Sequence, residues 1–163
     1  MKPIRIVLIE DDPLTRAGLR SYLSTSPQID WVGEAADGEA GLALISQTHP
    51  DVAIIDVRLP GMSGIKMTKQ IKTWAPEQQC RVMILTLNHQ EEMVLAAFAA
   101  GADAYCLKDS HSAFLIEAIQ ATHAGFAWID PAIARIVLAR SLRREPFSPN
   151  TPLPYKLTSR ELE

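Results

Sequence analysis

The chain has little cysteine, no long apolar run and no clustered histidines. Two cysteines, Cys80 and Cys106, lie in apolar segments, so a disulfide scaffold is excluded and a reducing, cytoplasmic location is predicted. No window approaches the roughly 20 apolar residues of a membrane helix, and the apolar run near the N-terminus is too short for a signal peptide. We therefore expect no membrane association. The histidines lack zinc-ligand spacing; they are His49, His89, His111 and His123.

Positive charge is not in excess either. The 163 residues include 16 Lys and Arg against 19 Asp and Glu, a formal net charge of −3, which excludes nucleic-acid binding over the whole surface. Hydrophobic residues make up 47% of the chain, enough for a substantial core. One compact domain is expected.

Short apolar segments alternate with segments of helical period five times along the first 125 residues. Such alternation predicts a parallel sheet with right-handed crossovers, because strands that are apolar throughout are buried on both faces. The predicted fold is α/β: a flavodoxin-like, doubly wound, five-stranded sheet of order 2-1-3-4-5. The predicted strands are 4–9, 31–34, 52–56, 82–86 and 104–107.

The composition changes beyond Gly125. Residues 126–144 predict a linker helix, with Asp130 as N-cap and Pro131 in its first turn. Residues 145–156 are rich in proline and predict an extended linker, and 157–163 begin another helix with a capping-box spacing. We expect residues 1–125 to be one domain and 157–163 to be the start of a second, mostly missing one.

Acidic and polar side chains follow the predicted strands at their carboxyl ends. Glu10 and Asp11 follow the first strand, Asp56 ends the third, Thr86 the fourth, and Lys108 follows the fifth. Ligands of such sheets bind at this edge, at the switch point between the first and third strands. Because three carboxylates so close together repel one another, cations are required. Lys108 supplies one, and Mg²⁺ is the divalent ion that suits the oxygen ligands.

A carboxylate in this position is a nucleophile toward phosphorus. Asp56 faces Lys108 and the metal site, and phosphoryl transfer needs little beyond positioning and charge neutralisation. Mg²⁺, Lys108 and the Thr86 hydroxyl would each meet one phosphoryl oxygen, and the backbone carbonyl of Arg58 would complete the metal shell. Asp12 is expected to cap the helix that begins at Pro13.

Four segments carry a family resemblance. They are IVLIEDDPLTRAGL (6–19), DVAIIDVRLPGMSGI (51–65), ILTLN (84–88) and AAGADAYCLKD (99–109). Together they resemble the receiver domain of two-component response regulators, in particular the NarL/FixJ subfamily of transcription factors with its CheY-like fold.

The resemblance implies roles for the residues at the strand ends. Asp56 would accept a phosphoryl group from a sensor histidine kinase, and Thr86 and Tyr105 would form a switch pair. Lys108 would contact the phosphoryl group, while Glu10, Asp11, Asp56 and the Arg58 carbonyl would bind Mg²⁺. Such a protein regulates transcription and turns over no substrate beyond its own phosphorylation and dephosphorylation.

The C-terminal segment LTSREL (157–162) resembles the start of a LuxR-type helix-turn-helix. DNA binding would therefore belong to a domain absent from this chain, and a homodimer is expected. Leu87, Arg58 and Asn88 flank the acceptor and are expected to affect access to it or the lifetime of its phosphoryl group.

Three alternatives remain from the sequence. The chain could be a receiver-fold interaction module that works without phosphate, which the complete set of Asp56, Thr86 and Lys108 argues against. A Mg²⁺-dependent aspartyl phosphatase would carry Asp-x-Asp after the first strand, where this chain has IEDDP. A flavin carrier would need a phosphate-binding Gly/Ser loop there, and none is found.

Overall fold

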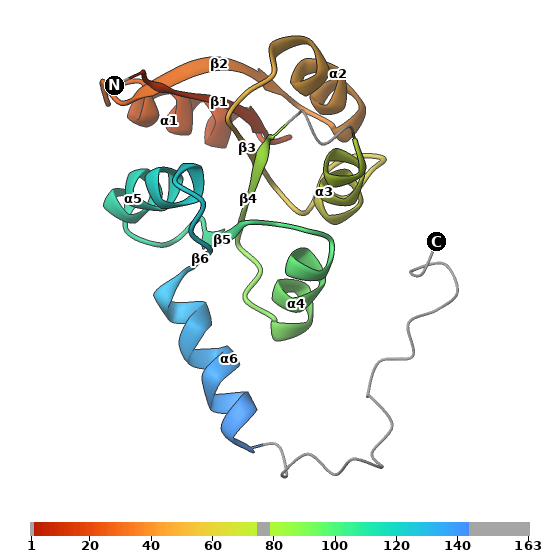
Figure 1. Ribbon diagram of the computed structural model, residues 1–163, viewed down its shortest axis with the longest axis vertical. Helices are drawn as coiled ribbons and strands as arrows, with labels where there is room; N and C mark the ends of the chain where they lie inside the picture. Colours follow the sequence, from red (N-terminus) through yellow and green to blue (C-terminus); the bar gives the residue numbers. More distant parts are fainter. Residues whose placement is uncertain (1, 75–78, 144–163) are drawn as a thin grey trace.

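The sheet is parallel and has six strands in the order β2-β1-β3-β4-β5-β6 (Figure 1). The structure is a computed structural model that describes residues 2–74 and 79–143. The predicted doubly wound α/β fold and the order of its first five strands are confirmed. The strands are β1 (Ile4–Ile9), β2 (Ile29–Ala35), β3 (Val52–Ile55), β4 (Arg81–Thr86), β5 (Ala104–Leu107) and β6 (Trp128–Ile129).

Helices cover both faces of this sheet. In Figure 1, α1 and α5 lie on one side and α2, α3 and α4 on the other, while α6 extends away from the sheet edge. The helices are α1 (Pro13–Leu23), α2 (Gly38–Thr48), α3 (Gly64–Thr73), α4 (Glu91–Ala99), α5 (Ser112–His123) and α6 (Pro131–Arg143). No helix among the described residues combines the length and the apolar character needed to cross a membrane.

Successive residues of a strand point alternately into two separate hydrophobic cores, one on each face of the sheet. In β1, Val7 and Ile9 belong to the core beneath α2, α3 and α4, whereas Ile6 and Leu8 belong to the core beneath α1 and α5. All four are buried, so neither face of the strand from Ile6 to Ile9 is open to solvent. This explains the continuous apolar runs of the sequence, since a parallel sheet covered on both faces has no side for polar residues.

Side-chain caps satisfy the first backbone N–H groups of several helices, including α1, α2 and α3. The Asp12 carboxylate accepts hydrogen bonds from the backbone N–H (2.8 Å) and the hydroxyl (2.6 Å) of Thr15, which confirms the predicted cap of α1. Asp37 and Ser63 cap α2 and α3 in the same way. These bonds satisfy N–H groups that a helix leaves unpaired in its first turn.

The sixth strand differs from the predicted five-stranded sheet. The segment predicted as a linker helix, 126–144, does not begin as a helix, because Trp128 and Ile129 first pair with β5, whereas the helix predicted after Asp130 is observed. The backbone N–H of Asp130 donates to the Tyr105 carbonyl at 2.9 Å, and α6 begins at Pro131. A two-residue strand is too short to show a periodic pattern. The predicted linker 145–156 and the segment 157–163 lie outside the described residues.

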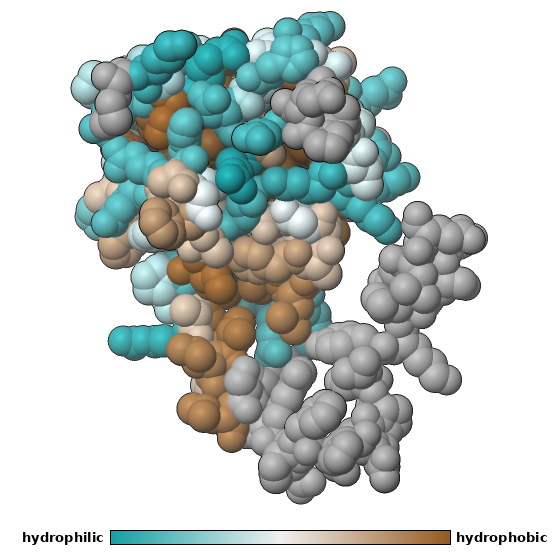
Figure 2. Space-filling view, viewed as in Figure 1, coloured by the Kyte–Doolittle hydropathy of each residue, from teal (hydrophilic) through white to brown (hydrophobic). Residues whose placement is uncertain are grey.

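Helix α6 exposes large apolar side chains. Ile133 is fully buried against the α4 side of the core, but Leu138 and Leu142 are 63% and 87% exposed. Figure 2 shows apolar colour over this part of the molecule, in contrast to the polar surface at the opposite end. Ile133 and the partly buried Val137 therefore anchor the first two turns of α6 to the domain.

Both cysteine thiols are expected to resist modification in the folded protein. Burial raises the pKa of Cys80 to about 11 and that of Cys106 to about 12. Because the thiolate is the reactive form, about a thousandth of Cys80 or less would be reactive at pH 8. Ellman's reagent should therefore react slowly with native protein and at once with both thiols in denaturant. A Leu138→Cys variant, exposed on α6, is the positive control, and rapid reaction of the wild type would contradict the prediction.

Candidate functional site

Three carboxylates meet where β1 and β3 end. Glu10 and Asp56 are buried, at 1% and 7% exposure, and Asp11 is exposed. One ligand oxygen from each lies within 4.8 Å of the other two. The parallel pairing of β1 with β3 produces this arrangement, since both strands end at the same edge of the sheet. The structure thus brings together the acidic residues that the sequence placed here.

Lys108 lies among these carboxylates. Its Nζ is 2.6 Å from Glu10 Oε2 and 2.9 Å from Asp56 Oδ2. Burial lowers the pKa of Lys108, but the contacts with Glu10 and Asp56 outweigh this effect and the pKa lies above its ordinary value. The pKa of Glu10 is also raised, because burial disfavours its charge more than Lys108 favours it. Lys108 therefore offsets only part of the cost of burying the negative charge of Glu10.

Hydrogen bonds from α1 hold the acidic loop in place. Arg16 donates to the backbone carbonyls of Glu10 (2.7 Å) and Asp11 (3.2 Å). The Asp12 N–H donates to Glu10 Oε1 at 3.2 Å, which leaves Oε2 facing Lys108. Sequence reasoning missed Arg16, although a long side chain in the first turns of a helix points back toward its N-terminus.

The loop after β3 positions Asp56. The Asp56 N–H donates to the Ile9 carbonyl at 3.0 Å, and the Gly64 N–H closes the loop by donating to the Val57 carbonyl at 2.8 Å. Asp56 Oδ1 lies 3.4 Å from the Arg58 N–H, so its other oxygen is the one that meets Lys108. Arg58 lines the cavity beside Asp56.

Thr86 and Tyr105 are joined through one residue. Thr86 Oγ1 accepts a hydrogen bond from the Asn88 N–H (3.2 Å), and the Tyr105 hydroxyl donates to the Asn88 carbonyl (2.7 Å). Both side chains are buried. Burial, and then the charge of Asp56, raises the pKa of Tyr105 to about 12, so its hydroxyl remains a donor at neutral pH. The sequence singled out all three residues, but this link was not foreseen.

A cavity of about 310 Å³ opens over Asp56. Leu87 lines it, but its side chain is 62% exposed, so most of it lies in solvent. The cavity is large enough for a phosphoryl group with a metal ion and water. Its lining residues are Asp56, Arg58, Thr86, Leu87, Asn88, His89, Gln90 and Lys108.

The donor set suits a hard divalent cation. Three carboxylates and one ammonium leave two negative charges uncompensated in the cluster. Mg²⁺ carries the matching charge, prefers oxygen ligands and keeps waters that a substrate oxygen can replace. Glu10, Asp11 and Asp56 are therefore the residues that fit this ion.

Comparisons with known proteins agree with the fold and with the motifs. Residues 6–120 match the family model of the response regulator receiver domain. The chain is 36% identical to the transcriptional regulatory protein LiaR of Bacillus subtilis over 161 residues, which are 98% of this chain and 74% of LiaR. It is 34% identical to the nitrate/nitrite response regulator protein NarL of Escherichia coli over 142 residues, which are 87% of this chain and 64% of NarL.

Solved structures are similar as well. A LuxR-family two-component response regulator from Aurantimonas superimposes with a TM-score of 0.82 at 34% identity, covering 87% of this chain and all of that one. The response regulator ChrA of a heme-sensing two-component system gives 0.71 at 35% identity, covering 90% of this chain and 70% of ChrA. The chain thus spans about two thirds to three quarters of the length of the curated relatives named above.

Proposed function

Because the chain belongs to the response regulator receiver family, among the NarL/LuxR-type transcriptional regulators, we propose that Asp56 accepts a phosphoryl group. One observation carries this proposal. Asp56 lies at the base of an open cavity with Lys108 Nζ 2.9 Å from one oxygen and with Glu10 and Asp11 close enough to share a cation. This combination supplies a nucleophile, a fixed positive charge and a metal site.

The residues around Asp56 would have different roles in phosphoryl transfer. Glu10, Asp11, Asp56 and the Arg58 carbonyl would hold Mg²⁺, which neutralises charge on the transferred group. Lys108 would move from the carboxylates toward a phosphoryl oxygen, and the Thr86 hydroxyl would donate to another. Each group is within or beside the cavity, so little reorganisation is needed.

The bonds to Asn88 suggest how the site would signal. If the Thr86 hydroxyl turns toward a phosphoryl group, its bond with the Asn88 N–H is lost. Without the bond to Thr86, the backbone of Asn88 is no longer held in place. Its carbonyl, which accepts a hydrogen bond from the Tyr105 hydroxyl, is then free to shift. Thr86 and Tyr105 would thus respond together, and the surface of α4, β5 and α5 would change with them.

The response would serve transcriptional regulation. LiaR and NarL are named as a transcriptional regulatory protein and a response regulator, which supports a regulatory protein rather than an enzyme with turnover. For this chain we propose a cytoplasmic location, a sensor histidine kinase as phosphoryl donor, a homodimer as the working form, and DNA binding through a C-terminal domain that follows α6.

Labelling with acetyl phosphate tests the proposal. We expect a phosphate-affinity gel to show a shifted band that requires both Mg²⁺ and Asp56, so Asp56→Asn or EDTA should reduce labelling about 100-fold or more, since either change removes the nucleophile or the neutralising cation. Asp30→Asn, which removes an exposed carboxylate of β2, should label like the wild type. Light scattering on the same samples reports dimer formation.

The alternatives predict other results. A phosphate-independent module would take no label while remaining folded, and a phosphatase would release phosphate continuously. Either outcome would reject Asp56 as a regulatory phosphoacceptor.

A further inference from the structure

Asp130 is a buried carboxylate to which the sequence assigned only a capping role. It lies between β6 and α6 and is 3% exposed. Its Oδ1 accepts a hydrogen bond from the Ala132 N–H at 3.0 Å, which confirms that it caps α6. Its other oxygen, Oδ2, makes contacts outside α6 that are not needed to cap the helix.

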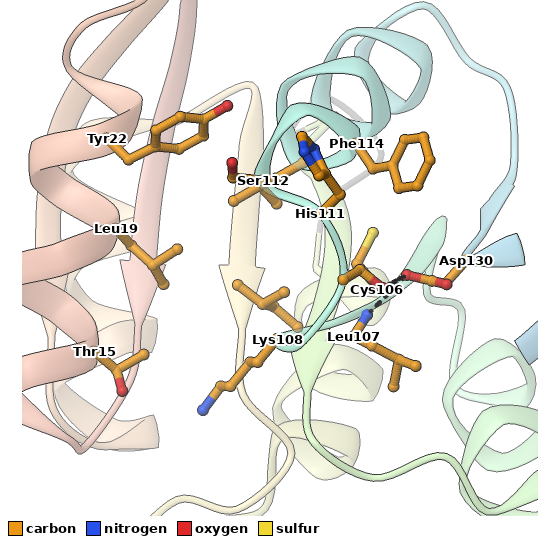
Figure 3. A pocket seen from close by; sticks show the side chains of 13 residues that line it. Thr15, Leu19, Tyr22, Cys106, Leu107, Lys108, His111, Ser112, Phe114 and Asp130 are labelled. Atoms are coloured by element: carbon orange, nitrogen blue, oxygen red, sulfur yellow. Dashed lines mark hydrogen bonds between the residues drawn. The ribbon is translucent and has the colours of Figure 1, made fainter. Parts of the chain in front are cut away.

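Oδ2 contacts the turn that carries Lys108. It accepts a short hydrogen bond from the Ser110 hydroxyl and lies 3.4 Å from the Leu107 N–H. These two residues bracket Lys108 in the chain. Figure 3 shows Asp130 joined to Leu107 by a dashed line, while the Lys108 side chain points away from Asp130. One carboxylate therefore holds both the turn that presents Lys108 and the first turn of α6.

The turn has room to move. A cavity of about 170 Å³ lies beside it, lined by Lys108, Ser110 and Asp130 together with Thr15 and Leu19 of α1 (Figure 3). Lys108 also lines the cavity over Asp56, so the same residue borders both spaces. The turn could therefore shift on its α1 side, into this cavity, as Lys108 moves from Glu10 and Asp56 toward a phosphoryl oxygen.

The first turn of α6 is held in the same region. Ile133 is fully buried in the core that contains Tyr105 and Leu107, and the Asp130 N–H donates to the Tyr105 carbonyl at 2.9 Å. The exposed Leu138 and Leu142 lie farther along the helix. Val137, one turn after Ile133, also packs against this core. A small change at Asp130 would therefore move the first two turns of α6 together with the exposed residues that follow them.

From these contacts we propose that Asp130 is a positioning residue that couples Lys108 to the direction of α6, so that occupancy of the acidic site turns this helix. The coupling rests on the proposed function, because its natural trigger is a phosphoryl group on Asp56. Lys108 would draw its turn toward the new anion, Ser110 and Leu107 would move with it, and Asp130 would carry the shift to Ala132. Any domain joined to α6 would receive the signal.

Two substitutions separate coupling from capping. Ser110→Ala removes the hydroxyl but leaves the Asp130–Ala132 bond. Asp130→Asn keeps an oxygen that can cap α6 but replaces Oδ2, which faces Leu107 and Ser110, with an amide that only donates. Asp109→Asn is the matched control, because its exposed side chain lies in the same turn.

The readout is a distance between spin labels. Cysteines placed at Lys69 on α3 and Leu138 on α6 are exposed, whereas the native thiols are buried. With acetyl phosphate and Mg²⁺, the distance distribution should change in the wild type and in Asp109→Asn. The change should be at least halved in Ser110→Ala and Asp130→Asn at equal labelling of Asp56, as read from the gel.

Equal changes in all variants, or none in a fully labelled wild type, would overturn the coupling. If Asp56 takes no label, the proposed function fails on the gel alone, and Mg²⁺ without phosphate then tests the coupling. In that case the NMR signal of the Lys108 ammonium and the label distance should both respond to Mg²⁺ in the wild type. In Ser110→Ala only the Lys108 signal should respond, and any other pattern rejects the coupling.

Discussion

Replacing Gly64 with alanine is expected to lower the free energy of unfolding by about 3 kcal/mol or more. A Cβ at this position would lie 2.1 Å from the Asp56 carbonyl oxygen and 3.0 Å from the Val57 Cα. Both are backbone atoms, so no rotamer change relieves the contact. Either the start of α3 or the strand end that carries Asp56 must shift.

The same shift should impair the site. Because a Cβ at Gly64 would contact the backbone of Asp56 itself, Gly64→Ala should weaken Mg²⁺ binding and Asp56 labelling as well as stability. Thermal and urea unfolding, each with and without Mg²⁺, measure the two effects. At this chain length 1 kcal/mol corresponds to about 2–4 °C in Tm, so a loss of about 6–12 °C is expected.

A second glycine provides the control. Gly18 lies in α1, and a Cβ added there would have no neighbouring atom within 4 Å. Alanine favours a helix by about 0.5–1 kcal/mol over glycine. Gly18→Ala should therefore stabilise the protein and leave labelling intact. A Gly64→Ala protein with wild-type stability and labelling would show that the loop tolerates the added carbon.

Replacing Lys108 with methionine is expected to destabilise the metal-free protein by about 3 kcal/mol. The substitution removes the ammonium that lies 2.6 Å from Glu10 and 2.9 Å from Asp56 and leaves two buried carboxylates facing each other. The pKa of Lys108 is raised on folding, so its contribution is complete at neutral pH and is lost only as the pH rises through that raised value.

Mg²⁺ should largely restore this loss, because the cation replaces the missing positive charge. Urea unfolding with Mg²⁺ and with EDTA is the measurement, and Lys108→Arg, which keeps a charge, should be affected less. Glu10→Gln should change stability by no more than about 1 kcal/mol, since the raised pKa of Glu10 means that folding already disfavours its charge. A Lys108→Met protein as stable as the wild type without Mg²⁺ would contradict this electrostatic account.

The residues of the site could be predicted from local sequence. Glu10 and Asp11 follow an apolar run, Asp56 ends another, and Lys108 follows a third, which is enough to place them at strand ends. The alternation of strands and helices then predicts a parallel sheet with right-handed crossovers, and the flavodoxin-like fold supplies the strand order. The Asp12 cap was predictable for the same reason, because its hydrogen bonds reach only three residues along the chain.

The contacts that link the site to the rest of the chain were not predictable. The Asn88 carbonyl accepts from Tyr105, 17 residues away, and Asp130 contacts Ser110 and Leu107, 20 and 23 residues away. β6 has two residues, too few to show a periodic pattern, so its pairing with β5 could not be predicted from the sequence. Local apolar periodicity and strand-end chemistry thus specify the elements and the acidic site, whereas long-range hydrogen bonds, which depend on how the elements pack, specify how that site reaches α6.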